Sequence, residues 1–208
     1  MFPREKHLAL ALPSFGAEQL ATTKTSFCIY FSLKVTSFIT NFLSPYTFGS
    51  RGVQAALVTY HKVADIAISF KDAKHLDDFV RQAEDILSDA PYGTERYVFN
   101  ALSQIFYYVL TNDAGYRPSA LHQVYIFTAD CFNGPDPVPL AQAIRSNQAS
   151  IHVIALAQTV SFWKEFVDVA GDANHFYEMY SDPDVALPIN LPKQAWRTLC
   201  PNGTCSLS

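Results

Sequence analysis

The stretch from Leu121 to Leu156 constrains the fold of this chain more than any other part of the sequence. It reads as an apolar strand that ends at Asp130, a proline-rich turn, a short helix and a second apolar strand. Two buried strands joined through a helix form a right-handed parallel crossover, and functional groups in such sheets gather at the carboxyl ends of the strands. We therefore expect Asp130 to lie at the functional edge of a sheet.

Strand and helix patterns alternate along the rest of the chain. Apolar runs predict strands at His7–Leu12, Val53–Tyr60, Ala64–Phe70, His122–Thr128, Ser150–Leu156 and His175–Met179. Apolar residues at helical spacing predict helices at Lys34–Leu43, Asp77–Leu87, Glu95–Leu110, Val138–Ser146, Ser161–Ala170 and Asp182–Ala186. The order predicts an α/β fold: a doubly wound, mostly parallel central sheet with helices on both faces and one short antiparallel edge strand.

Composition narrows the partners. The 208 residues suit one domain, and 49% of them are hydrophobic, which is enough to build a core. The net charge of −4, with no stripe of Lys and Arg, argues against a nucleic-acid partner. A membrane span over Phe27–Leu43 is disfavoured by Lys34, because a charged side chain at the centre of a span is costly.

The sequence lacks the motifs of common enzyme classes. It has no Gly-x-Ser-x-Gly turn, no Walker loop and no glycine-rich dinucleotide turn, so we predict that the protein is not an enzyme. Cys131 follows a strand but has no base assigned to it, and we expect a small, half-buried side chain. His122 and His152 are expected to be hydrogen-bonded polar residues of central strands.

Features near the two chain ends give conflicting indications about export. The Cys200–Cys205 spacing could close a small loop in an oxidising compartment, and Asn202 begins a glycosylation sequon. Both favour an exported protein. Leu8–Leu12 is too short an apolar run for a signal peptide, and Pro13 interrupts it.

Four local sequences follow one another along the chain: Gln54–Tyr60, Val124–Asp130, Asn133–Ala141 and Cys200–Gly203. In this order they resemble the von Willebrand factor type A domain, in the divergent form found with C-type lectin domains in nematode secreted proteins. Gln54–Tyr60 resembles the second strand of that family and Val124–Asp130 its fourth strand. Asn133–Ala141 resembles the loop and helix start that follow, and Cys200–Gly203 is similar to the Cys-Pro-Asn-Gly that opens the lectin module. The resemblance extends over Leu8–Leu187.

This resemblance implies a metal ion-dependent adhesion site at the carboxyl end of the sheet, built from hard oxygen ligands on three loops. In the first loop, Leu12 stands where the family has a ligand Asp, and Gly16 replaces its second Ser. Ser14, Thr94 and Asp130 occupy or lie next to the remaining ligand positions. The resemblance therefore implies a degenerate site, with no metal or with Mg²⁺ held weakly by Ser14, Thr94 and Asp130. From the residues alone, capping is the favoured interpretation of both residues: Asp130 would cap the turn that follows it, and Thr94 the helix that follows it.

The same comparison divides the chain into segments. Residues 1–6 are an amino-terminal extension, 7–190 a type A domain, and 191–208 a tail that could begin a truncated lectin module. Lys24–Phe27 nearly repeats as Lys34–Phe38, which makes residues 25–34 a candidate insertion in the first helix.

Two functions follow. The first is an extracellular, non-enzymatic recognition module that binds a protein or carbohydrate ligand through the loops Leu12–Gly16, Pro91–Glu95 and Asp130–Val138. The alternative is a degenerate structural or interaction fragment with no active site on that face.

Overall fold

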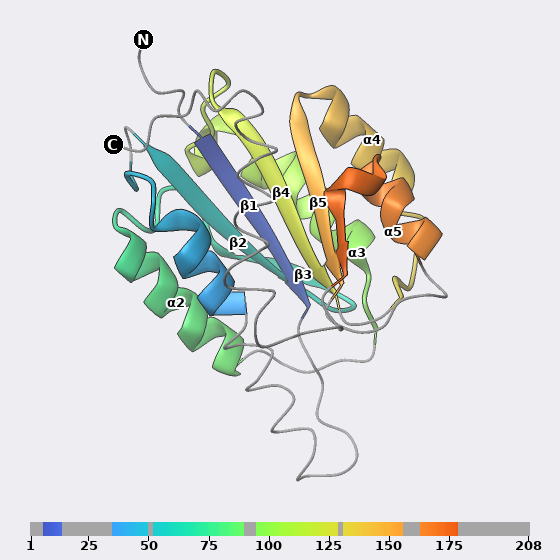
Figure 1. Ribbon diagram of the computed structural model, residues 1–208, viewed down its shortest axis with the longest axis horizontal. Coiled ribbons are helices and arrows are strands. Elements are labelled where there is room, and N and C mark those ends of the chain that lie inside the picture. The colour runs from blue at the N-terminus through green and yellow to red at the C-terminus, as the bar shows by residue number, and fades with distance from the viewer. Residues whose placement is uncertain are drawn as a thin grey trace, which may run out of the picture.

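A six-stranded sheet forms the centre of the molecule (Figure 1). The computed structural model describes residues 6–13, 35–49, 52–89, 95–128, 131–155 and 163–178. Within them the strand order is β3-β2-β1-β4-β5-β6. The strands are β1 (Lys6–Pro13), β2 (Val53–Tyr60), β3 (Ala64–Ile68), β4 (Leu121–Thr128), β5 (Ala149–Ala155) and β6 (Phe176–Glu178).

The pairing confirms the predicted fold class. Strands β2, β1, β4, β5 and β6 run parallel to their neighbours, and β3 pairs antiparallel with β2 at one edge. The described helices are residues 35–43, α2 (Leu76–Asp89), α3 (Val98–Gln104), α4 (Val138–Ser146) and α5 (Trp163–Ala170). Shorter turns are the π-helix η1 (Ile105–Val109) and the 3₁₀ turns η2 (Asn112–Ala114) and η3 (Ala173–His175).

Alternate residues of each strand face two separate apolar layers, because successive side chains of a strand point to opposite faces. The helix of residues 35–43 and α2 cover one face, where Leu10, Leu57 and Tyr125 are fully buried. Helices α3, α4 and α5 cover the other face, which includes Val58 and Val153. Helices on both faces were predicted, and this is confirmed.

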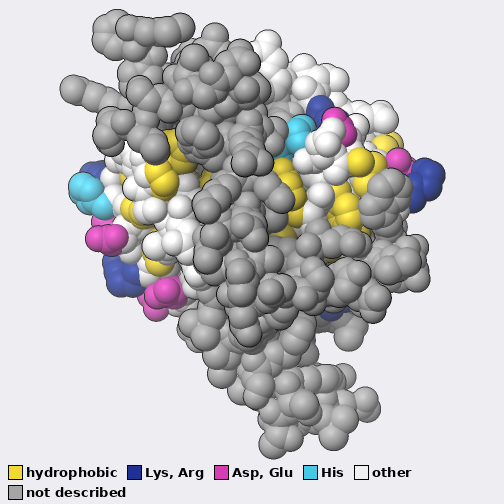
Figure 2. Space-filling view, in the orientation of Figure 1, with side chains coloured by type: hydrophobic (Ala, Val, Ile, Leu, Met, Phe, Trp, Pro, Cys, Tyr) yellow, Lys and Arg dark blue, Asp and Glu magenta, His cyan; other side chains and the backbone are white. Residues whose placement is uncertain are grey.

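The first of these faces carries an aromatic cluster. The Phe38 ring lies 5.3 Å from the Phe127 ring and 5.8 Å from the Tyr125 ring, and Phe42 packs on Tyr125 at 5.3 Å. Figure 2 views the molecule from this side and shows hydrophobic side chains near the middle, with charged side chains gathered toward the left and right margins.

The parallel strands bring their carboxyl ends to one edge of the sheet. Leu12 of β1 pairs with Thr59 of β2, and Ala11 pairs with Ile126 of β4. Thr128 of β4 pairs in turn with Ala155 of β5. We call this boundary the carboxyl edge; it lies at the bottom of Figure 1.

Most predicted elements differ from those observed by one or two residues at an end, and two of the differences have a clear local cause. The helix expected over Glu95–Leu110 begins only at Val98, and its last part is the π-helix η1, in which Leu110 N donates to Ile105 O at 2.9 Å. Strand β6 begins at Phe176, one residue later than expected, since His175 belongs to η3. The predicted helix Asp182–Ala186 and the candidate insertion at residues 25–34 lie outside the described residues.

No helix in the described ranges has the length and apolar character needed to cross a membrane.

Candidate functional site

The three predicted site residues, Ser14, Thr94 and Asp130, lie outside the residues that the structure describes. Their positions in the chain can still be related to described neighbours. Strand β1 ends at Pro13, and β4 ends at Thr128 beside it on the carboxyl edge. The description resumes at Glu95 and at Cys131, one residue after Thr94 and Asp130 respectively. The described segments 95–97 and 131–137 therefore show how the chain next to two of the predicted site residues is held.

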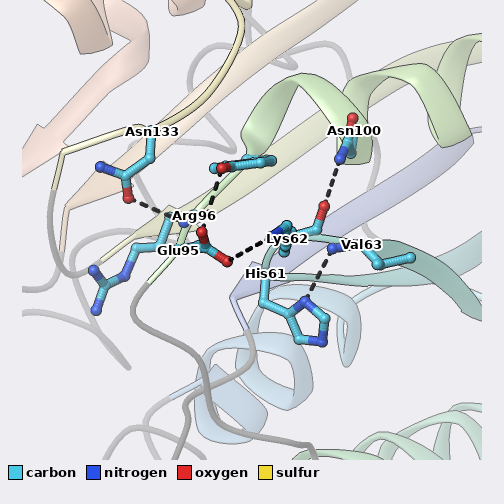
Figure 3. Close-up of polar contacts among 8 residues, drawn as sticks. His61, Lys62, Val63, Glu95, Arg96, Asn100 and Asn133 are labelled. Atoms are coloured by element: carbon cyan, nitrogen blue, oxygen red, sulfur yellow. Dashed lines mark hydrogen bonds and ion pairs between the residues drawn. The ribbon is translucent and has the colours of Figure 1, made fainter.

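Segment 95–97 is fixed to the turn between β2 and β3 (Figure 3). Tyr97 N donates to His61 O at 2.9 Å, and Asn100 Nδ2 donates to Lys62 O at 2.7 Å. The turn is itself closed by Val63 N, which donates to His61 Nδ1 at 3.0 Å. These bonds hold the start of α3 against the end of β2.

One ion pair supplements them at the surface. Lys62 Nζ lies 3.9 Å from Glu95 Oε2, with side chains 65% and 47% exposed. At that exposure an ion pair contributes at most about 1 kcal/mol. The hydrogen bonds of Tyr97 and Asn100 therefore do more to hold the two segments together.

Segments 95–97 and 131–137 are joined by a reciprocal pair of hydrogen bonds. Arg96 N donates to Asn133 Oδ1 at 3.1 Å (Figure 3). In return, Asn133 N donates to Arg96 O at 3.0 Å. We call this pair of bonds the clasp. It connects the chain just after Thr94 with the chain just after Asp130, although the two clasp residues are 37 positions apart in the sequence.

A glycine packs beside the clasp. Gly134 has φ +82°, and a Cβ built there would lie 2.8 Å from the Tyr97 ring. A side chain at residue 134 would therefore meet both an unfavourable backbone conformation and a steric conflict. Segment 131–137 rests directly on the ring that precedes α3.

Segment 131–137 is also held from its other end. Asp136 Oδ1 accepts from Val138 N at 2.9 Å at the start of α4. The Glu165 carboxylate of α5 accepts a hydrogen bond from the Phe132 backbone, while burial is the main cause that raises the pKa of Glu165 and the nearby Asp136 charge adds to it. Asp136 lies between Pro135 and Pro137, and its carboxylate thus accepts from the first N–H of α4.

Tyr60 lies beneath these segments at the end of β2. Its side chain is fully buried, and its hydroxyl donates to Phe127 O at 3.0 Å. Burial raises the pKa of Tyr60 strongly, while a hydrogen bond with Thr128 and the Arg96 charge act in the opposite direction. Tyr60 is therefore neutral, and its hydroxyl links the end of β2 to the end of β4.

The described part of the site carries charges of both signs. Lys62 and Arg96 are cations, and Glu95, Asp136 and Glu165 are carboxylates. In the described ranges no three His, Cys, Asp or Glu side chains come together as a metal site.

Cys131 is half-buried, as expected, and accepts a long hydrogen bond from Asn133 Nδ2 at 3.9 Å. Sequence reasoning missed Arg96, Tyr97 and Asn133. Only Asn133 carried a signal, because Asn-Gly-Pro marks a turn; nothing in the sequence marked Arg96 as its partner.

Comparisons with known proteins agree with this architecture. The von Willebrand factor type A domain matches residues 29–187, a stretch that begins after β1. A search of curated protein sequences finds no match.

Solved structures share the fold at low sequence identity. Proximal thread matrix protein 1 from the mussel byssus superposes with a TM-score of 0.78 at 16% identity, covering 95% of this chain and 49% of that chain. A second structure of it, with a zinc-occupied MIDAS motif, gives 0.74 at 16% identity over 95% and 48% of the two chains. The manganese-loaded TRAP protein of Plasmodium vivax gives 0.67 at 12% identity over 88% and 72%. The chain thus spans about half the length of the mussel protein.

Proposed function

The chain belongs to the von Willebrand factor type A domain family, and we propose that it is a non-enzymatic adhesion or recognition module that binds a ligand through the loops at the carboxyl edge. The ligand class that we propose is an extracellular protein, with a carbohydrate as the second possibility. Domains of this family generally act in adhesion, without a reaction of their own.

The observation that carries this proposal is the clasp between Arg96 and Asn133. A recognition surface made of loops must be rigid, because ordering mobile loops on binding costs free energy. The clasp, the Tyr97 bond to the β2–β3 turn and the Asp136 cap all hold the described loop segments in one arrangement. Binding residues carried by loops on such a scaffold are typical of recognition domains.

The finer assignments belong to the same proposal. Ser14, Thr94 and Asp130 would hold the cation, which would supply a positive charge to attract an anionic group of the ligand. With Leu12 in place of a carboxylate, the site would have one charged ligand, and affinity for Mg²⁺ falls with ligand charge and number. We propose extracellular residence, a type A domain over residues 7–190 and the nematode, lectin-associated branch on the resemblance described above.

Calorimetry on the full chain tests the cation site. Mg²⁺, Mn²⁺ and Zn²⁺ are titrated separately; Mn²⁺ and Zn²⁺ are the ions in the structures of TRAP and the mussel protein. We expect binding in the millimolar range or tighter, and at least tenfold weaker binding in Asp130→Ala and Thr94→Ala. Asp113→Asn is the matched control, because Asp113 is exposed in η2, before the amino end of β4. Equal heats in wild type and both site variants would contradict the cation assignment.

Ligand binding is tested separately on an array of immobilised extracellular-matrix proteins and glycans. We expect binding that Thr94→Ala and Asp130→Ala weaken without lowering the melting temperature. Equal losses of folding in both variants would show instead that Thr94 and Asp130 are caps. Retained folding with no captured ligand would favour the alternative, a structural fragment, which the loss of the ligand Asp at Leu12 also favours.

A further inference from the structure

A buried histidine lies far from the clasp, near the opposite end of the strand order. His152 is in the middle of β5, and its side chain is 0% exposed. Its Nδ1 lies 3.3 Å from the hydroxyl of Tyr177, while its Nε2 is buried without a hydrogen-bond partner. The prediction that His152 is a satisfied polar residue is therefore wrong for Nε2.

Aromatic rings surround this imidazole. The Tyr125 ring of β4 stacks on it at 4.6 Å with 11° between the planes, and the Tyr125 hydroxyl donates to Gln123 at 3.1 Å. The His175 ring of η3 lies 4.5 Å away at 47°. His152 is thus in contact with a second imidazole, from a segment 23 residues later in the chain.

The segment that carries this second imidazole is short. Residues 173–178, which we call the edge segment, comprise η3 and the three-residue strand β6. Among the residues that the structure describes, strand β6 pairs with β5 through three residue pairs, Val153 with Phe176 through Ala155 with Glu178. Beyond this, the Phe176 ring lies 5.8 Å from Phe166, and Tyr177 contacts His152. Short edge strands open at lower free energy than central ones.

We propose that His152 and His175 form an acid-sensitive latch, whose protonation releases the edge segment from β5 while the rest of the sheet remains folded. In the closed state both imidazoles are neutral. Release exposes His152 to water, which can then solvate its charge.

The groups around the pair disfavour positive charge. Burial, with a smaller contribution from the neighbouring His175, lowers the pKa of His152 to about 3. Burial also lowers the pKa of His175; the Asp172 charge opposes this, and Arg145 of α4 adds to it. Asp172 is exposed and accepts two hydrogen bonds from Asn174.

The facing tyrosines provide no anion. Burial raises the pKa of Tyr125 well above its usual value, and the nearby Tyr177 and Tyr46 act in the same direction. Tyr125 therefore stays neutral throughout the acid range. In the closed state, protonation would place two positive charges on adjacent rings with no described carboxylate in contact with His152.

The latch lies on a strand that reaches the carboxyl edge, because Glu178 of β6 pairs with Ala155 at the end of β5. Acid release would therefore alter the same edge of the sheet that carries the clasp. The inference stands whether or not that edge binds a ligand, since it concerns the opening of the edge segment.

Hydrogen exchange of the full chain, read by mass spectrometry at pH 7.5 and pH 5.0, tests the latch. Protection factors, corrected for the intrinsic pH dependence of exchange, are compared between peptides covering residues 173–178 and peptides covering β2, a central strand that contains no histidine. With pKa values of about 3 closed and 6.5 open, protection of the edge segment should fall by about 30-fold between these pH values. Protection of β2 should change by less than threefold. A change in residues 173–178 of less than threefold, or an equal loss in β2, would overturn the proposal.

Variants separate the latch from general acid sensitivity. In His152→Gln the pH-dependent loss of protection should largely disappear, and in His175→Gln, which removes the second imidazole, the loss should be smaller than in wild type. His75→Gln is the matched control, because His75 is exposed in the turn before α2, and it should behave as wild type. If His152→Gln does not fold, His175→Gln decides alone. The proposal that His152 and His175 together sense acid would be refuted by either of two results. One is a loss of protection in His175→Gln equal to that in wild type; the other is the absence of this loss in His75→Gln.

Discussion

At the scale of single residues, the carboxyl edge depends on backbone groups that are used outside regular structure. Arg96 and Tyr97 precede α3, yet their N–H groups donate to Asn133 and His61 instead of entering the helix. Buried or half-buried backbone groups require partners, and here those partners lie on other loops. The identity of residue 133 matters because its side chain both accepts from Arg96 and sits at the start of a tight turn.

Gly134 gives a direct test of that packing. We expect Gly134→Ala to lower the free energy of unfolding by about 2–3 kcal/mol, because a Cβ adds strain at φ +82° and lies 2.8 Å from the Tyr97 ring. Urea denaturation followed by circular dichroism measures the change.

Gly115→Ala is the matched control for this variant. Gly115 also has a positive φ, +90°, but its Cβ would lie 3.0 Å from Lys71 Cγ, a less severe contact than the 2.8 Å at Gly134 and one made with an exposed residue. We expect a smaller loss of about 1 kcal/mol there, mainly from backbone strain. Equal losses in the two variants would mean that the Tyr97 ring moves aside, and that segment 131–137 is not held as tightly as the geometry indicates.

At the scale of elements, helix α5 shows which contacts hold a helix to the sheet. Phe166 is 0% exposed and packs against Phe132 at 4.9 Å, whereas Lys164 and Asp168 form an exposed ion pair at 2.6 Å. We expect Phe166→Ala to lower the free energy of unfolding by about 3–5 kcal/mol through loss of burial and formation of a cavity.

Lys164→Ala is the comparison within the same helix. It removes the ion pair but no buried surface, and we expect no measurable change in the urea midpoint. A loss in Lys164→Ala that approaches the loss in Phe166→Ala would contradict the view that the apolar face alone positions α5.

The elements also show where sequence reasoning was sufficient. The strand Val53–Tyr60 and the helix Val138–Ser146 were predicted with the bounds observed, because apolar burial imposes a clear period on both. The helix start at Glu95 was wrong because periodicity does not show that Arg96 and Tyr97 bond to distant loops. The clasp was missed for the same reason: Asn133 finds Arg96 through the fold, and no local pattern encodes a contact 37 residues apart.

At the scale of the whole molecule, each face of the sheet carries a buried imidazole. His152 lies among Tyr125 and Tyr177 on the face covered by α2. His122 of β4, whose pKa is also lowered by burial, lies on the other face, because it alternates with Val124 and Ile126. The pKa of His152 is lowered from 6.5 to about 3, so the folded state binds fewer protons than the unfolded state below pH 6.5. This contribution to stability is complete above about pH 6.5 and is lost as the pH falls toward 3.

We therefore expect the free energy of unfolding to depend on His152 in a defined pH window. Linkage predicts that protonation of His152 lowers the free energy of unfolding by at most about 2 kcal/mol between pH 7.5 and pH 5. The loss is smaller if the edge segment opens first, because His152 is then already exposed to water. Urea titrations of wild type and His152→Gln at half-unit pH intervals measure this loss. The difference in free energy of unfolding between the two proteins should narrow as the pH falls. His75→Gln should run parallel to wild type across the same range. A constant difference between wild type and His152→Gln would show that His152 does not stay neutral in the folded protein, and the assignment of the buried imidazole as an acid-sensitive group would fail.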